Sequence, residues 1–221
     1  MAENRVRHSE AQAASLITDA DEIARRESEN ALRQAEHIRE VILSYIGPER
    51  PFRLRPSMFL TLNRIAVEGL NIYAGNWRPA GVSIQGSKHT PPDGFRVPEL
   101  VEEICDYVNL VWESSTPVHL AALTMWRINW IHPFVDGNGR TARAVAHIVL
   151  SIRAQTYFPG EYTIPEQIIL NREPYYLALE AADKAYEASG FMGSVVIDLE
   201  KLISGMLAVQ LKSAFDNATG Q

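Results

Sequence analysis

The sequence contains little of the chemistry that marks secreted or membrane-bound proteins. Its single cysteine, Cys105, cannot form an intramolecular disulfide, and the apolar residues around it are typical of a small core position. No run approaches the roughly 18 consecutive apolar residues of a membrane span, and the first residues have no apolar leader. We therefore expect a cytoplasmic protein with no membrane partner, although release by a route without a classical leader stays open.

Positive charge is also scarce. The formal net charge is -6, and affinity for nucleic acid comes largely from neutralising phosphates. This balance argues against a nucleic-acid partner and predicts that positive charge is concentrated at a local site. The sequence has no G-x-x-x-x-G-K-[ST] string, which excludes a Walker-type nucleotide site, and no paired His or Cys at metal spacing.

What is present is the composition of a globular protein. Apolar residues make up 46% of the 221 residues and charged residues 22%, which is enough for one full core with one or two helical attachments. Helical periodicity dominates the chain. We expect helices at 20–45, 56 to about 72, 100–111, 119–131, 140–149, 174–189 and 195–211.

Two of these helices carry informative detail. In the first, apolar residues share one side, and Gly47 and Pro48 end the pattern; the residues are Leu32, Ala35, Ile38, Ile42 and Tyr45. The helix 119–131 is apolar nearly all round, which predicts a buried central helix with Thr116 as its N-cap. Because residues before proline avoid the helical region, Pro133 makes His132 its natural last residue.

Glycine and proline interrupt the helical pattern between residues 73 and 98. Within this stretch, Val82, Ser83, Ile84 and Gln85 alternate at the strand period, which predicts a small hairpin. The expected fold class is therefore all-α with a small β-hairpin.

Residues 132–143 read HPFVDGNGRTAR and carry most of the functional information. Gly137 and Gly139 can adopt positive φ, so the amides around Asn138 can converge into an anion-binding nest at the start of a helix. By itself such a loop is more often an ordinary turn. Arg140 and Arg143 favour the phosphate interpretation, because residues three apart share a helix face and two guanidinium groups can hold different phosphates. Either arginine alone would be an ordinary solvated side chain.

Asp136 and His132 supply the remaining chemistry. Mg²⁺ usually takes one or two carboxylates and fills its other positions with phosphate oxygens and water, so Asp136 alone is enough, although a turn-forming role also fits it. His132 has the pKa range needed to accept a proton from a hydroxyl. We assign ordinary structural roles to the other histidines, which are His8, His37, His89, His119 and His147.

The dodecapeptide resembles the signature H-x-F-x-[DE]-G-N-G-R-x-x-R of the Fic family, and every specified position is met. The resemblance implies a protein adenylyltransferase that moves AMP from Mg-ATP to a Ser, Thr or Tyr hydroxyl of a target protein. Carried over by motif position, His132 would be the base and Asp136 the Mg²⁺ ligand. The anion hole would be Gly137, Asn138 and Gly139, and Arg140 and Arg143 would hold the β and γ phosphates.

The resemblance extends more weakly into the flanks. Arg78 and residues Val82, Ser83, Ile84 and Gln85 are similar to the family's flap, a hairpin that pairs with the target backbone. Asn171, followed by Tyr175 and Tyr176, is similar to the segment that helps to form the adenine pocket. The implied organisation is an amino-terminal helical extension (1–55), a Fic core (56–190) and a carboxyl-terminal helix on the core (191–221).

Three alternatives remain open from the sequence. Some relatives transfer other phosphate-containing groups, and the Doc branch phosphorylates its target; Doc-like proteins usually have lysine where this chain has Gly139, which favours AMP. The same site would also suit removal of AMP from modified targets. A module that senses nucleotide without turnover would need neither His132 nor Asp136.

One family feature is incomplete. Many relatives are inhibited by a helix bearing [ST]-x-x-x-E-[GN], whose glutamate pairs with the second motif arginine. Here Glu29 and Asn30 follow Arg25 where Ser or Thr is expected, and Thr18 stands where another partial copy would have glutamate. We therefore expect no strong self-inhibition through this motif, or restraint by a separate inhibitory partner.

Overall fold

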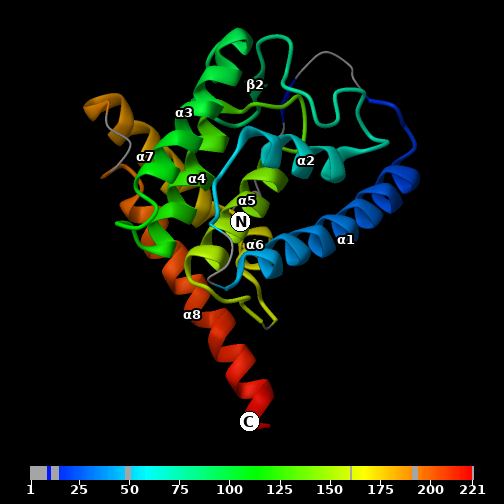
Figure 1. Cartoon of the computed structure of the whole chain (residues 1–221). Coiled ribbons are helices and arrows are strands. Elements are labelled where there is room, and N and C mark those ends of the chain that lie inside the picture. The colour runs from blue at the N-terminus through cyan, green and yellow to red at the C-terminus, as the bar shows by residue number, and fades with distance from the viewer. Residues whose placement is uncertain (1–8, 11–14, 48–50, 160, 191–193, 221) are drawn as a thin grey trace.

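A computed structural model describes residues 9–10, 15–47, 51–159, 161–190 and 194–220. The described part is mainly helical, which confirms the expected fold class (Figure 1). Its helices and strands are β1 (Ser9–Glu10), α1 (Ala20–Tyr45), α2 (Pro56–Val67), β2 (Ser83–Ile84), a 3₁₀ turn (Gly94–Arg96), α3 (Val97–Leu110), α4 (Pro117–Ile131), α5 (Asn138–Arg153), α6 (Ile164–Leu170), α7 (Glu173–Ser189) and α8 (Ile197–Thr219).

Helix α4 is the central helix, as its apolar circumference predicts. It packs against α3, α5, α7 and α8, and most of its side chains are buried. Thr116 caps its start by accepting a hydrogen bond from the His119 backbone N–H at 3.1 Å, and Pro117 occupies the first turn. Cys105 on α3 is a core residue, and burial raises the pKa of its thiol to about 12.

Helix α1 is correctly bounded by its sequence pattern, and the predicted face is buried in its carboxyl-terminal half, where Ile38, Ile42 and Tyr45 meet the core, but not in its amino-terminal half. The predicted apolar side is wrong at Leu32, which is 74% exposed, whereas Ile42 is fully buried. Two polar α1 side chains reach α2 and the residue after it. Asn30 donates to the carbonyls of Ala66 and Glu68, and Gln34 donates to that of Leu62. These amides satisfy carbonyls near the end of α2, so polar pairing joins the two helices.

Several helices differ from the sequence expectation, and α8 runs to Thr219 rather than to residue 211. Helix α2 ends at Val67 rather than near residue 72, because Gly69 adopts a positive φ of 76° and turns the chain. Helix α6 was not predicted. Its start carries a capping box in which the Thr163 and Glu166 side chains each bond the other's backbone N–H, a sequence signature that would have revealed it.

The predicted strand near residues 82–85 is present as β2, followed by a turn closed by the Ser87 N–H and the Ile84 carbonyl at 3.1 Å. Its strand partner comes from the amino-terminal segment. Ser9 lies opposite Ile84 and Glu10 opposite Ser83 in an antiparallel pair. The sequence pattern located the strand but not this partner.

Helix α8 extends beyond the rest of the helical body at its carboxyl-terminal end (Figure 1). Over the described stretches, no helix combines the length and apolar character that crossing a bilayer requires.

Candidate active site

The loop between α4 and α5 borders a cavity of about 440 Å³. Side chains from α1, α4, α5, α6 and α7 line it, together with the segment after β2. All motif residues from Asp136 to Arg140, with His132 and Arg143, face this one space. The structure therefore brings together the residues that the motif predicts to act as one site.

His132 lies at the junction between α4 and the loop. It is the C-cap of α4 in the left-handed region, with φ 51° and ψ 58°, and it is 7% exposed. Pro133 has no N–H to continue the helix, so the Asn129 carbonyl lacks its usual donor. The His132 Nδ1–H reaches this carbonyl at 3.3 Å. This tautomer leaves Nε2 as the nitrogen that can accept a proton.

Burial keeps the His132 imidazole neutral. Desolvation is the main reason that its pKa falls from 6.5 to about 4, with smaller lowering effects from the nearby Arg78 and His89. A neutral imidazole at pH 7 is the form that a general base requires.

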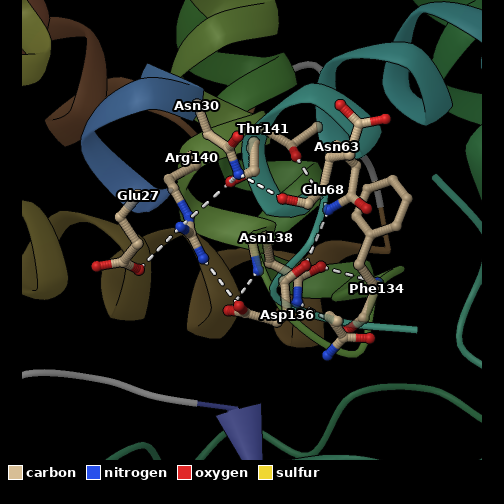
Figure 2. A network of polar contacts seen from close by, with 12 residues as sticks. Glu27, Asn30, Asn63, Glu68, Phe134, Asp136, Asn138, Arg140 and Thr141 are labelled. Carbon is tan, nitrogen blue, oxygen red and sulfur yellow. Dashed lines mark hydrogen bonds and ion pairs between the residues drawn. The ribbon is translucent and has the colours of Figure 1, made fainter. Parts of the chain in front are cut away.

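The anion loop depends on two residues for its shape. Gly137 has φ 81°, and a Cβ there would lie 2.8 Å from Val67 Cγ1 and 2.9 Å from Asn63 Nδ2. The Asn138 side chain closes the loop by accepting from the Phe134 N–H and donating to the Phe134 carbonyl, each at 2.9 Å (Figure 2). The Asn138 side chain thus shapes the loop, while the amides at the start of α5 are placed for an anion.

Asn63 on α2 is a supporting residue that the motif does not contain. It is 1% exposed, donates to the Asp136 carbonyl at 2.8 Å and accepts from the Gly75 N–H at 3.0 Å. It therefore ties the motif loop to the chain after α2 (Figure 2). The sequence offers one sign of this supporting role: an asparagine stands at a helix position that faces the core.

Arg140 is already held by two carboxylates. Its guanidinium pairs with Asp136 at 2.8 Å and with Glu27 of α1 at 3.0 Å (Figure 2). Asp136 also accepts from the Gly137 N–H at 2.6 Å. A phosphate that binds Arg140 must therefore replace carboxylate partners, and these pairs are partly exposed and weak enough to exchange.

Arg143 differs from Arg140. Among the described residues it forms no ion pair and donates no hydrogen bond, although its guanidinium faces the cavity. Burial lowers its pKa, and Arg140 and Arg172 add a smaller lowering effect. A cation in this position is the strongest physical sign that the cavity is shaped for an anion.

Asp136 fits the Mg²⁺ role by its chemistry. Its carboxylate is 47% exposed at the cavity beside the anion loop, and Mg²⁺ accepts a single protein carboxylate when phosphates complete its shell. In the described stretches no group of three or more acidic, His or Cys side chains forms a preassembled metal cage, so the phosphates would have to supply most ligands.

The expected adenine-pocket residues are only partly in place. Tyr175 and Tyr176 line the cavity, and Tyr175 accepts from Asn129 Nδ2 at 2.9 Å. Asn171 is exposed at the end of α6 and does not line the cavity, whereas its neighbour Arg172 does.

The flap segment (residues 79–88) lies at another side of the cavity, which Ile84 lines directly. Of the expected docking residues, Val82 and Gln85 flank β2, and Ser83 and Ile84 form it. The family resemblance implies that β2 has a free backbone edge for the target, but one edge is already paired with Ser9–Glu10, so the expectation is wrong on that side.

Glu29 does not reach Arg143. It pairs with Arg25 at 3.0 Å and with Arg26 at 3.5 Å on its own helix. The α1 carboxylate that contacts the motif is Glu27, and its partner is the first motif arginine, Arg140. Glu29 of the partial motif thus belongs to the α1 surface, whereas Asn30 is buried against α2.

The site also predicts an acid sensitivity of the fold. His147 on α5 resembles His132 in that burial lowers its pKa from 6.5 to about 4. Between pH 6.5 and 4 these two histidines bind protons in the unfolded chain but stay neutral in the folded chain. The free energy of unfolding therefore falls as the pH is lowered. A pKa difference of one unit between the folded and unfolded states corresponds to about 1.4 kcal/mol. Each histidine should therefore lower the free energy of unfolding by about 3 kcal/mol by pH 4.

Denaturant titrations at pH 7, 5.5 and 4.5 would check this. His147→Leu should flatten the pH dependence by about half, because it removes one of the two histidines without touching the cavity that holds His132. An unchanged slope in the variant would contradict the assignment.

The fold and site define a helical protein with a base and an anion loop at the junction of two central helices. The Fic/DOC family model matches residues 53–150. Residues 53–150 are therefore a Fic/DOC family domain.

Individual relatives show how much of the chain this family likeness covers. Protein adenylyltransferase Fic of Drosophila willistoni is 37% identical over 114 residues, which is 51% of this chain and 21% of that protein. A Fido domain-containing protein of Dictyostelium discoideum is 33% identical over 101 residues, covering 42% of this chain and 64% of that protein. The chain thus spans about a fifth of the Drosophila relative.

The architecture is shared with solved structures. A Fic domain containing signaling protein from Bacteroides thetaiotaomicron superposes with a TM-score of 0.69 at 24% identity, covering 87% of this chain and 73% of that one. At this identity the likeness supports the fold alone.

Proposed function

We propose that the protein transfers AMP from Mg-ATP to a Ser, Thr or Tyr hydroxyl of a target protein. The observation that carries the proposal is that three groups lie around one cavity: the neutral His132 imidazole, the amides that begin α5, and the Arg143 guanidinium, which has no carboxylate partner in the part of the chain that the structure describes. The adenylyltransferase name of the Drosophila relative supports the choice of AMP.

The proposed step uses each group once. The target hydroxyl oxygen attacks the α-phosphorus of ATP while its proton moves to His132 Nε2. A phosphodiester bond forms between target and AMP, the bond from the α-phosphorus to the bridging oxygen breaks, and pyrophosphate leaves with that oxygen. The α5 amides and Arg143 bind the phosphate charge and fix its direction relative to the base.

The remaining residues orient the reactants. Tyr175 and Tyr176, which line the cavity on its α7 side, would contact the base of the nucleotide. Asp136 would hold Mg²⁺ together with phosphate oxygens, and the ion would neutralise part of the phosphate charge. Main-chain pairing with β2 would place the target hydroxyl with little demand on target sequence.

Labelled ATP tests the proposal. The purified protein is incubated with cell lysate and either α-labelled or γ-labelled ATP. Label should enter protein from the α position only. Label from the γ position would show phosphorylation instead, and nucleotide binding without labelled protein would support the sensing alternative.

The β1–β2 pair leads to a separate expectation about target access. Ser9–Glu10 occupies one backbone edge of β2, so a target that uses this edge must displace it. Removing residues 1–12 should lower the KM for a protein target several-fold, because the displacement cost disappears, and should leave the KM for ATP unchanged.

Glu10→Pro offers a milder test, since it removes one backbone N–H from β1 and keeps the chain length. Steady-state kinetics with a fixed target would check both variants. A target KM equal to that of the full chain in both would show that the target uses the other edge of β2.

A further inference from the structure

The carboxyl-terminal end of α4 presents carbonyls that have no helical donor, and residues at both ends of the flap satisfy them. At the entering end, Arg78 is 2% exposed and donates from Nε to the His132 carbonyl at 2.8 Å. Its backbone N–H reaches the Pro133 carbonyl at 2.9 Å, and a longer contact of 3.4 Å reaches the Ile131 carbonyl. Arg78 therefore joins the start of the flap to the residue that carries the base.

At the returning end, His89 performs the matching task. The Trp130 carbonyl lacks a helical donor because the Phe134 N–H donates to the Asn138 side chain. His89 Nε2 lies 2.7 Å from the Trp130 carbonyl. A carbonyl oxygen only accepts, so Nε2 must carry the proton of this hydrogen bond.

Trp130 provides a rigid support for His89. The two rings stack with centroids 5.5 Å apart at 34°. The Arg127 guanidinium lies 4.2 Å from the Trp130 ring centroid, and this fully buried arginine is itself paired with Glu103 at 3.2 Å. The cation–π contact and the ion pair hold the indole in one place.

The flap between these two attachments has little packing of its own. No residue from 79 to 88 is buried, and the only strand pairing in its described surroundings is the two-residue match of β2 with β1. The distance from β2 to the base therefore depends on Arg78 and His89.

We propose that His89 is a positioning residue that fastens the returning end of the flap to α4, and so holds a docked target in line with His132. The inference deepens the proposed function and rests on it. His89 also lines the same cavity as His132, although sequence reasoning assigned it an ordinary structural role.

The geometry supplies a matched pair of substitutions. In His89→Gln the amide Nε2 lies as many bonds from the backbone as the imidazole Nε2, so the donor to Trp130 is preserved. In His89→Asn the amide matches Nδ1 instead and cannot reach. His89→Ala removes both the donor and the stacked ring.

We expect His89→Ala and His89→Asn to lower kcat/KM for a protein target by about 10-fold to 100-fold, because misplacement of a reactant by about 1 Å is enough for such a loss. The KM for ATP should not change. His89→Gln should restore most of the transfer. Hydrogen exchange should report faster exchange of the amides at 82–85 in the alanine and asparagine variants and near-normal exchange in the glutamine variant.

Two results would overturn the proposal. One is wild-type transfer and wild-type exchange in His89→Ala. The other is a glutamine variant that protects the flap but does not transfer, since His89 would then take part in the chemistry itself. If the wild-type protein modifies no target, the proposed function is wrong, and the exchange of residues 82–85 in the three variants still decides whether His89 fastens the flap.

Discussion

Replacing His132 by alanine is expected to reduce AMP transfer by about 10² to 10⁴-fold while leaving the affinity for Mg-ATP nearly unchanged. The reason is that in the proposed step one imidazole nitrogen accepts the proton of the incoming hydroxyl, while the other donates to the Asn129 carbonyl. Its loss removes the base without removing a phosphate ligand. Single-turnover transfer and calorimetric titration with Mg-ATP measure the two quantities separately.

His147→Gln is the matched control for this experiment. His147 is also a partly buried histidine with a pKa lowered to about 4, but it does not line the active-site cavity. The variant should transfer AMP at the wild-type rate. A His132→Ala variant that turned over as fast as the control would remove His132 from the mechanism.

Replacing Arg143 by methionine is expected to change nucleotide affinity and stability in opposite directions. In the proposed function Arg143 donates charge-assisted hydrogen bonds to phosphate, and each such bond contributes about 1.5–3 kcal/mol, so two lost bonds should weaken Mg-ATP binding by about 100-fold or more. Without nucleotide, the guanidinium is mostly buried and has no carboxylate partner among the described residues. Removing it should raise the free energy of unfolding by about 1 kcal/mol.

Arg140→Met gives the comparison. Arg140 is 28% exposed and pairs with Asp136 and Glu27, which are themselves about half exposed, so its loss should change the stability little. Chemical denaturation of both variants without nucleotide, with Mg-ATP titration alongside, separates the two arginines. An Arg143→Met protein that is less stable than wild type would show that the guanidinium has a structural role.

The motif made most of the site predictable because its residues are close in the chain. A helix that ends at a histidine before proline, a glycine loop and a new helix with two arginines already bring His132, Gly137 and Arg143 together. Local sequence rules determine each of these steps. The central position of helix α4 was predictable for a similar reason, because a helix with apolar residues on nearly all sides must be buried.

Apart from helix α6, whose capping box was a local sign, the missed features are contacts between segments distant in sequence. Asn63 supports the Asp136 carbonyl from α2, and His89 supports the Trp130 carbonyl from beyond the flap. A polar residue on a helix or loop gives no local sign of the carbonyl that it will meet. The α1 face shows the same limit, because burial of Asn30 and exposure of Leu32 follow from carbonyls at the end of α2.

The central claim is that this cavity transfers AMP and releases pyrophosphate. The most direct measurement is the ratio of pyrophosphate released to AMP incorporated into protein during a single turnover, with His132→Ala as the blank. The account predicts one pyrophosphate for each AMP bound to a hydroxyl, and neither product in the blank. ADP with phosphorylated protein, or pyrophosphate without modified protein, would contradict it.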